Sequence, residues 1–200
     1  MSEAVYDGLV SRHLNRRVSR PLARLLARTP ATPNQVSIAS LGLAVACFGC
    51  FASGYYIAGA LLAQASSIAD GIDGDLARLK NMSSAFGGFM DAILDRYSDS
   101  LILLGLTVWA ASGSGSYVWV VGFWALVGTF TVTYTRARIN GPLAGPFDRG
   151  ITSVASRDVR LLMVMVGALL GQGLGTLVVM AALTNIVVFL RLLAARRILK

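Results

Sequence analysis

Residues 70–95 read DGIDGDLARLKNMSSAFGGFMDAILD, and this stretch places five aspartates within 26 residues of an otherwise apolar chain. The apolar run on either side of it is too short to cross a bilayer, because a spanning helix needs about 20 mostly apolar residues. Two membrane helices must therefore each carry aspartates into the bilayer. Carboxylates at that depth are costly unless cations compensate them, so we expect them to face the interior of a helix bundle or a wet cavity.

The rest of the chain has the composition of a membrane protein. It has 200 residues, of which 55% are hydrophobic and only 14% charged, outside the usual range of soluble domains. The segments long enough to span are 33–53, 56–79, 84–112, 116–138, 157–172 and 174–195. The sequence therefore predicts an all-α integral membrane protein with six transmembrane helices, which make up one membrane domain over residues 32–200.

Residues 1–31 precede the first span and are expected to form a cytoplasmic juxtamembrane segment. Apolar residues recur at helical spacing on one side and arginines on the other, as in an amphipathic helix that lies along the membrane surface. The apolar residues are Leu9, Val10, Leu14, Val18, Leu22, Leu25 and Leu26. Pro21 is expected to kink or divide this helix, and a disordered basic tail is the alternative. Thr32 is expected to cap the first span, with Pro33 at its first helical position.

The arginines and lysines give the predicted orientation. All 18 fall on one side of the six-span arrangement, and the three turns on the other side carry no charged residue. Because positive residues accumulate on the cytoplasmic side, we expect a multi-pass protein of the cytoplasmic membrane with both termini and the acidic segment facing the cytoplasm. The net charge of +8 then faces anionic membrane lipids and phosphorylated substrates. We expect no nucleic-acid partner.

The spacing of the aspartates predicts a metal site. Asp70 and Asp73 are three residues apart, and Asp91, Asp95 and Asp99 are four apart, so each set occupies one helix face. The short connection near residue 80 should make the two helices antiparallel neighbours and bring these faces together. Four oxygen ligands without a nearby His or Cys favour Mg²⁺ or Mn²⁺. One or two ions held by the first four carboxylates would suit phosphoryl transfer.

Small residues flank the aspartates on both helices. They are Gly71, Gly74, Ala77, Gly87 and Gly88. They serve either close helix packing or the space for a nucleotide base and its diphosphate. Arg78, one turn beyond Gly74, can bind a phosphate or pair with an aspartate. Asp75 lies off the Asp70 face and is either a partner for an arginine or a headgroup contact.

These residues together carry a resemblance to a known family. The pattern is Asp70-x2-Asp73-Gly74-x2-Ala77-Arg78-x8-Gly87-x3-Asp91-x3-Asp95. It is identical to the signature of the CDP-alcohol phosphatidyltransferase family, and the six spans and the amphipathic N-terminal helix also resemble that family. The resemblance implies a metal-dependent transfer: a hydroxyl attacks the β-phosphorus of a CDP-linked alcohol, CMP leaves, and a phosphodiester forms.

The resemblance also implies roles for individual residues. The implied ligands of one or two Mg²⁺ or Mn²⁺ ions are Asp70, Asp73, Asp91 and Asp95. The implied catalytic residues are Asp95, which resembles the general base, and Asp91. The set expected to bind CDP is Asn34, Asp70, Asp73, Gly74, Ala77, Arg78 and Gly87, in which Asn34 is added because it lies at cytoplasmic headgroup depth. The family further implies a homodimer, for which the glycines at 167, 171, 173 and 175 offer packing surfaces unless they serve only a turn.

The acceptor alcohol is predicted from segments outside the signature. LDRYSD (94–99), YTRARI (134–139) and SRDVRL (156–161) resemble enzymes that make inositol phosphodiesters, namely di-myo-inositol phosphate phosphate synthase domains and phosphatidylinositol phosphate synthases. Such acceptors carry a phosphate of their own. We therefore expect an arginine clamp for an acceptor phosphate, composed of Arg136, Arg138, Arg157 and Arg160. The alternative is ordinary cationic flanking of membrane helices.

Other functions fit parts of this pattern. A CDP-diacylglycerol-dependent synthase of phosphatidylglycerol phosphate or phosphatidylinositol phosphate, or an enzyme using soluble CDP-inositol, would share the same site. A divalent-cation transporter would also place carboxylates in the membrane. Two features argue against transport: the acids stop near one side of the membrane, and transport does not explain the fixed spacing of Gly74, Ala77 and Arg78.

Overall fold

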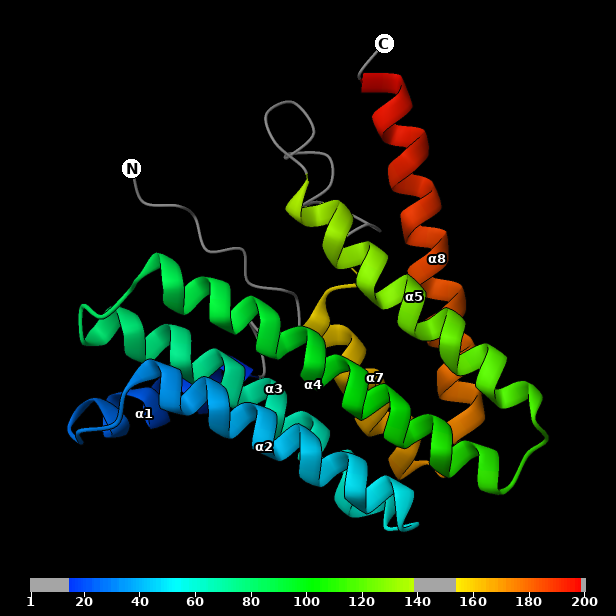
Figure 1. Ribbon diagram of the computed structural model, residues 1–200, viewed down its shortest axis with the longest axis horizontal. Helices are drawn as coiled ribbons and strands as arrows, with labels where there is room; N and C mark the ends of the chain where they lie inside the picture. Colours follow the sequence, from blue (N-terminus) through cyan, green and yellow to red (C-terminus); the bar gives the residue numbers. More distant parts are fainter. Residues whose placement is uncertain (1–14, 139–153, 199–200) are drawn as a thin grey trace.

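The computed structural model describes residues 15–138 and 154–198, and in these ranges the chain is helical with no strand (Figure 1). The helices are α1 (Arg16–Ala27), α2 (Pro33–Ala52), α3 (Tyr56–Leu79), α4 (Ala85–Ser112), α5 (Tyr117–Ala137), α7 (Arg157–Leu169) and α8 (Gly173–Ile198). The predicted all-α fold is confirmed. The part of the amphipathic stripe before residue 15 lies outside the described residues.

Two capped helix starts fix the backbone on the cytoplasmic side of the predicted arrangement. Thr32 is extended and accepts a hydrogen bond from the Gln35 amide, while the Gln35 side chain accepts one from the Thr32 amide. With Pro33 at the first helical position, this is the capping box that starts α2 as predicted. The α4 helix starts in a similar way, because the Ser84 hydroxyl accepts a bond of 3.0 Å from the Gly87 amide.

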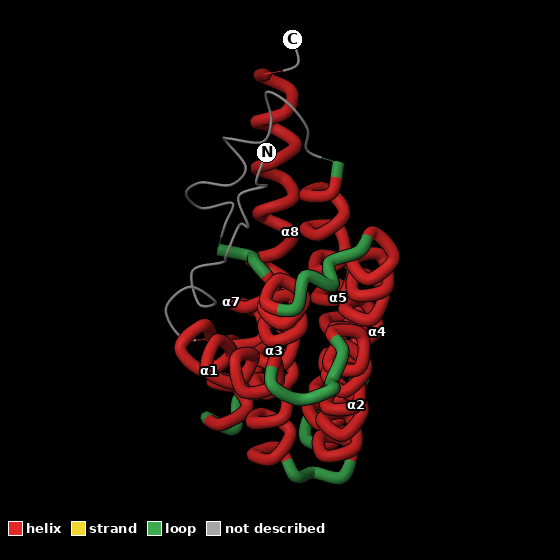
Figure 2. Tube along the Cα trace, turned by 90° about the vertical axis from the view of Figure 1, so that its left-hand side faces the viewer, coloured by secondary structure: helices red, strands yellow, loops and turns green. Residues whose placement is uncertain are grey.

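The helix packing differs from the expected arrangement of the acid-bearing helices. Helix α2 packs against both α3 and α4, whereas α3 and α4 contact each other only over a short stretch. Helix α7 packs against α3 and α8, and α5 pairs with α8 (Figure 1). Figure 2 shows the C-terminal part of α8 extending beyond the other helices. The prediction that α3 and α4 are neighbours is therefore confirmed only over a short stretch, because α2 packs against both of them.

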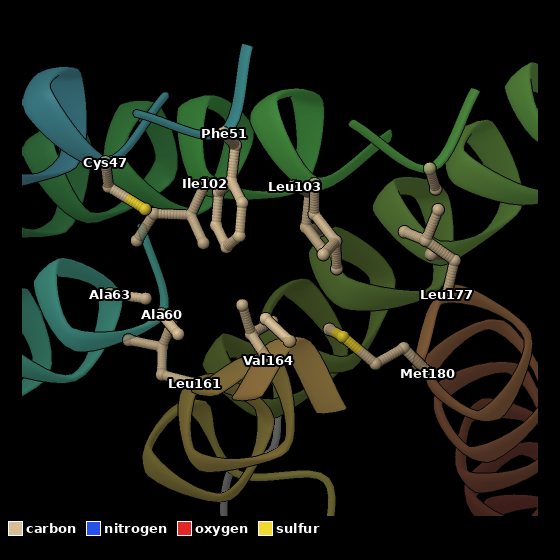
Figure 3. Close-up of a cluster of buried hydrophobic side chains, with 14 of the residues drawn as sticks. Cys47, Phe51, Ala60, Ala63, Ile102, Leu103, Leu161, Val164, Leu177 and Met180 are labelled. Carbon is tan, nitrogen blue, oxygen red and sulfur yellow. The ribbon is translucent and has the colours of Figure 1, made fainter. Parts of the chain in front are cut away.

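Small residues allow α2 to fit closely against its neighbours. A Cβ atom added at Gly105 of α4 would lie 2.9 Å from the Phe48 Cα atom, so the two backbones approach each other there. Gly59 of α3 leaves room in the same way for the Phe51 ring. Phe51 and Cys47 pack with Ile102 of α4 in the buried cluster of Figure 3. This cluster holds the three helices together away from the aspartates.

The glycines considered for a dimer surface have roles within the chain. A Cβ atom at Gly167 would collide with Thr176 of α8, and one at Gly173 would lie 2.7 Å from the Trp109 ring. Gly171 has a φ of 70°, which L-residues with side chains rarely adopt. These glycines therefore serve the α7–α8 turn and its packing. This favours the interpretation that they serve only a turn over the interpretation that they form a dimer surface.

Three helices are long and apolar enough to cross a membrane among the described residues: α2, α5 and α8. Helices α3 and α4 have sufficient length, with 24 and 28 residues, but their polar and charged residues lower their hydropathy. Helix α7 has only 13 residues. The predicted count of six spans is therefore wrong by length and hydropathy alone. The chain is an integral membrane protein whose site-bearing helices are also its more polar ones.

Helix α1 covers the described part of the predicted amphipathic segment. Pro21 lies inside one continuous helix, so the predicted division does not occur there. Ser19 and Ala23 are buried against α3, whereas Val18, Leu22 and Leu25 are 44%, 40% and 60% exposed. The apolar stripe thus points away from the bundle, and a different face of α1 packs on the protein.

Candidate active site

Three carboxylates from two helices meet in one place. Asp70 of α3 and Asp91 and Asp95 of α4 each offer an oxygen atom, and these atoms lie within 4.8 Å of one another. The helical spacing of four residues puts Asp91 and Asp95 on one face, which turns toward α3. We call these three residues the acidic centre. Its all-oxygen donor set fits a hard divalent cation such as Mg²⁺ or Mn²⁺.

Asp73, the fourth predicted metal ligand, lies beside the acidic centre and outside its tight group. Its side chain is buried, and its Oδ2 atom accepts a hydrogen bond of 2.5 Å from the Ser37 hydroxyl of α2. Asp73 also lines an adjoining pocket together with Asp91. Ser37 is a site residue that the sequence analysis missed, because a serine in an apolar helix gives no signal until its partner is known.

Arg157 of α7 supplies positive charge at the acidic centre. Its Nη1 atom lies 2.8 Å from Asp70 Oδ1 and 3.1 Å from Asp95 Oδ1. Its Nε atom donates a hydrogen bond of 3.0 Å to Asp99 Oδ1. One guanidinium therefore contacts aspartates from both acid-bearing helices. This agrees with the expectation that carboxylates inside a helix bundle are paired with cations, because unpaired ones are costly there.

Asp99 is the hub of a second ionic cluster. It is only 3% exposed, and its Oδ2 atom accepts a bond of 3.1 Å from Arg160 Nη2. Arg160 also donates a bond of 2.6 Å to the Ala155 carbonyl, and Arg96 approaches Asp99 to 3.6 Å. The sequence placed Asp99 on the face of Asp91 and Asp95 but gave it no role. The spacing of Asp99 on its helix, taken together with the arginines of SRDVRL, could have predicted this role as a partner for arginines.

A pocket adjoins the acidic centre, and Asp91 belongs to both. Its walls come from the start of α2, the end of α3 and the start of α4. Of the residues predicted to bind CDP, those on the pocket walls are Asn34, Asp73, Gly74, Ala77, Arg78 and Gly87. Asp70 lies in the acidic centre instead.

Glycines keep this pocket open. A Cβ atom at Gly87 would lie 3.1 Å from the Ser84 hydroxyl and 3.4 Å from Asn34 Oδ1, so a side chain there would push on the wall. At Gly88, the next residue, an added Cβ atom meets nothing within 4 Å. The two interpretations of the small residues therefore separate by position: Gly87 permits a close approach at the wall, and Gly88 faces open space.

The four arginines of the predicted acceptor clamp do not share one environment. Arg157 and Arg160 start α7 and contact Asp99. Arg138 follows the end of α5, is exposed, and donates a hydrogen bond of 3.2 Å to the Tyr134 hydroxyl. Arg136 lies in the last turn of α5. The structure brings two of the four to the acidic centre and its neighbouring cluster.

Comparison with known proteins settles which family contains this site. Residues 30–192 match the family model described as CDP-alcohol phosphatidyltransferase. The chain belongs to this family. The membership predicted from residues 70–95 is confirmed, and most of the family model lies within the described residues.

Two curated members of the family show how the chain compares in length. The bifunctional IPC transferase and DIPP synthase of Rubrobacter xylanophilus is 43% identical over 191 residues, which is 96% of this chain and 43% of the relative. This chain thus spans less than half of that protein. The archaetidylinositol phosphate synthase of Pyrococcus horikoshii is 34% identical over 157 residues, or 76% of this chain and 79% of the relative.

A solved member of the family has the same fold. The phosphatidylinositol phosphate synthase of Mycobacterium tuberculosis with CDP-DAG bound matches with a TM-score of 0.69 and 26% identity, over 88% of this chain and 92% of that one. The same enzyme in complex with manganese and citrate matches with a TM-score of 0.69 and 25% identity, over 88% and 87% of the two chains.

Proposed function

We propose that this protein transfers a phospho-alcohol group from a CDP-linked donor to a polar alcohol, releases CMP and forms a phosphodiester. One observation carries the proposal. The acidic centre of Asp70, Asp91 and Asp95 adjoins a pocket lined by small residues, and Asp91 faces both. The acidic centre and the pocket are therefore in contact through one carboxylate. Family membership supports the same reaction.

The metal requirement is part of this proposal. Asp70, Asp91 and Asp95 would hold one or two Mg²⁺ or Mn²⁺ ions, with Asp73 completing the set from the pocket side. When bound there, such ions neutralise the diphosphate and the departing CMP oxygen. Manganese in the Mycobacterium tuberculosis enzyme supports a divalent ion without choosing between the two metals.

Residues of this chain would have separate roles in the transfer. The acceptor hydroxyl attacks the β-phosphorus, its proton passes to the Asp95 carboxylate, and the bond to CMP breaks with the electron pair leaving on CMP. Asp91 belongs to the acidic centre and also lines the pocket, so it would help to hold a cation next to the reacting diphosphate. Ser37 holds Asp73 in place with its short hydrogen bond.

The donor side is the pocket. Asn34, Gly74, Ala77 and Gly87 would surround the cytidine part of the donor, where only small groups leave room for it. Arg78 is 46% exposed at the pocket wall and can reach a phosphate oxygen. The CDP-DAG bound to the solved relative supports a lipid donor, and soluble CDP-inositol is the other candidate.

The acceptor side is the start of α7. Arg157 Nη2 is a buried nitrogen with no hydrogen-bond partner among the described residues, and a buried donor of this kind is costly unless an acceptor atom reaches it. A phosphate on the acceptor would satisfy it, with Arg160 beside it. The inositol phosphate synthases among the relatives support an inositol phosphate as acceptor. Arg136 and Arg138 would make a smaller contribution from the end of α5.

The membrane arrangement is also proposed. Helices α2, α5 and α8 would cross the bilayer, with both termini and the acidic centre on the cytoplasmic side, as the distribution of positive residues supports. The apolar stripe of α1 would lie in the lipid headgroup region. The protein would act among membrane lipids as a homodimer.

The test is a reconstitution. Purified protein in lipid nanodiscs receives Mg²⁺ or Mn²⁺, one of a panel of CDP-linked donors and one of a panel of polyol phosphates, and released CMP is measured. We expect CMP release that requires both substrates and stops with EDTA. Full release after chelation would contradict the metal site, and Mn²⁺ uptake into liposomes without any CMP release would support the cation-transporter alternative.

A further inference from the structure

Asp75 lies outside the family signature, and its carboxylate joins two helices, α1 and α3. Its side chain is only 12% exposed. Its Oδ1 atom accepts a hydrogen bond of 2.7 Å from Arg78 Nη2, and the same oxygen accepts one from Arg16 Nη1 of α1. The Ser19 hydroxyl lies 3.4 Å from Oδ2. The ambiguity of the sequence is thus resolved, because Asp75 is a partner for arginines.

Arg78 is the member of this cluster that faces the proposed donor. It lines the pocket, and its long side chain would otherwise sample many rotamers at 46% exposure. The pair with Asp75 spans one helical turn and restricts it. A Cβ atom added at Gly74 would lie 3.8 Å from both terminal nitrogens of Arg78, so the guanidinium lies along the open surface of that glycine.

Helix α1 is fixed on α3 at both of its ends, and Asp75 lies between these attachments. At the start, Asn15 donates a bond of 3.0 Å to Ser67 and accepts one of 2.8 Å from Gln64. Beyond the end of α1, Lys80 donates bonds of 2.6 Å to the carbonyls of Thr29 and Ala31. Arg16 is therefore held against Asp75 by the docking of its whole helix, and its side chain is 10% exposed.

The charges of the cluster favour an anionic ligand. Two guanidinium groups contact the single carboxylate of Asp75, and Arg78 is the one of the two that lines the pocket. Without Arg16, the pair of Asp75 and Arg78 would be neutral. Without Asp75, Arg78 would keep its charge but lose its fixed direction. Orientation and charge thus depend on different members of the cluster.

We propose that Asp75 is a positioning residue for the diphosphate of the donor: it holds Arg78 along the pocket wall, and Arg16 makes the docking of α1 part of donor binding. The inference rests on the proposed function, since it assigns the pocket to a nucleoside diphosphate group. It predicts that changes at Asp75 and Arg16 act on the affinity for the donor and leave the acceptor side unaffected.

The test separates KM for the donor, KM for the acceptor and kcat in the CMP-release assay. For Asp75→Asn we expect the donor KM to rise about fivefold, from the loss of a charge-assisted hydrogen bond, with kcat and the acceptor KM within about twofold of wild type. For Arg16→Gln we expect a rise of about threefold, because its charge acts at longer range. Asp75→Glu keeps the charge and should restore most of the donor affinity.

The matched control is Arg20→Gln, which removes an exposed arginine from the same helix and should leave the donor KM unchanged. Direct binding of CMP, measured by calorimetry, gives a second readout. If Asp75→Asn does not fold, the CMP affinities of Arg16→Gln and Asp75→Glu test the inference instead. A wild-type donor KM and CMP affinity in Arg16→Gln and Asp75→Asn would overturn the inference. If the wild-type protein releases no CMP, the proposed function fails instead.

Discussion

The two sides of the acidic centre are built in different ways. The proposed donor side is an open pocket with glycines and alanine on its walls and one arginine that is nearly half exposed. The proposed acceptor side has many charged groups, with Asp99 and Arg160 almost fully buried at 3% exposure each. We therefore expect space to limit binding on the first side, and charge pairing to limit both binding and folding on the second. Substitutions on the two sides should therefore have different effects on substrate binding and on stability.

The largest effect is expected where the two sides meet. Asp95→Asn removes the proposed base and one acid of the centre while keeping the size of the side chain. We expect kcat to fall about a hundredfold or more, with unchanged helical content by circular dichroism. Near-normal CMP release in this variant would mean that the reaction is not organised around the acidic centre.

The next effect tests the acceptor side. Asp99→Asn leaves Arg157 and Arg160 without their common buried carboxylate, and breaking a buried ion pair costs about 3 kcal/mol. We expect a clearly lower unfolding temperature in detergent together with a higher KM for the phosphorylated acceptor. A stable variant with normal acceptor KM would remove the contrast drawn between the two sides.

A smaller effect tests the space on the donor side. Gly87→Ala places a methyl group 3.1 Å from the Ser84 hydroxyl and 3.4 Å from Asn34, so the pocket wall must move slightly. We expect a donor KM about threefold higher with unchanged acceptor KM. Gly42→Ala is the matched control, since it gains the same helix propensity, meets nothing within 4 Å and lies outside the pocket. Equal kinetics in the two variants would show that space at Gly87 does not limit donor binding.

The smallest effect sharpens the acceptor assignment. Arg138→Ala removes an exposed side chain that bonds to Tyr134, and exposed interactions of this kind contribute about 1 kcal/mol or less. We expect less than about a twofold change in acceptor KM, against a large rise for Arg157→Ala. A comparable rise in both variants would extend the clamp to the end of α5.

Local rules predicted much of this site. The spacing of Asp91 and Asp95 fixed their common face, and Thr32 with Pro33 predicted the start of α2. The convergence with Asp70 followed from the cost of unpaired acids in a membrane helix. These predictions hold because each depends on neighbours along one helix or on a single strong energetic requirement.

What the sequence could not supply depends on contacts between distant segments. Nothing in the chain before Asp70 indicates that Ser37 reaches Asp73, or that α2 packs on both acid-bearing helices. Asp75 and Asp99 each had a position on a helix but no partner until α1 and α7 were placed. The span count failed for a related reason, because the acids that build the site also make α3 and α4 less apolar than ordinary membrane helices.

The ammonium group of Lys80 links two connections that are 49 to 51 residues apart in the chain. One leads from α1 into α2 just before Asn34, and the other leads from α3 toward α4 just after Arg78. Since a single amine binds carbonyls of the first from its place in the second, thermal motion of either connection is transmitted to the other. The two connections next to the pocket are therefore coupled, and we expect amide hydrogens on both of them to exchange with solvent at correlated rates.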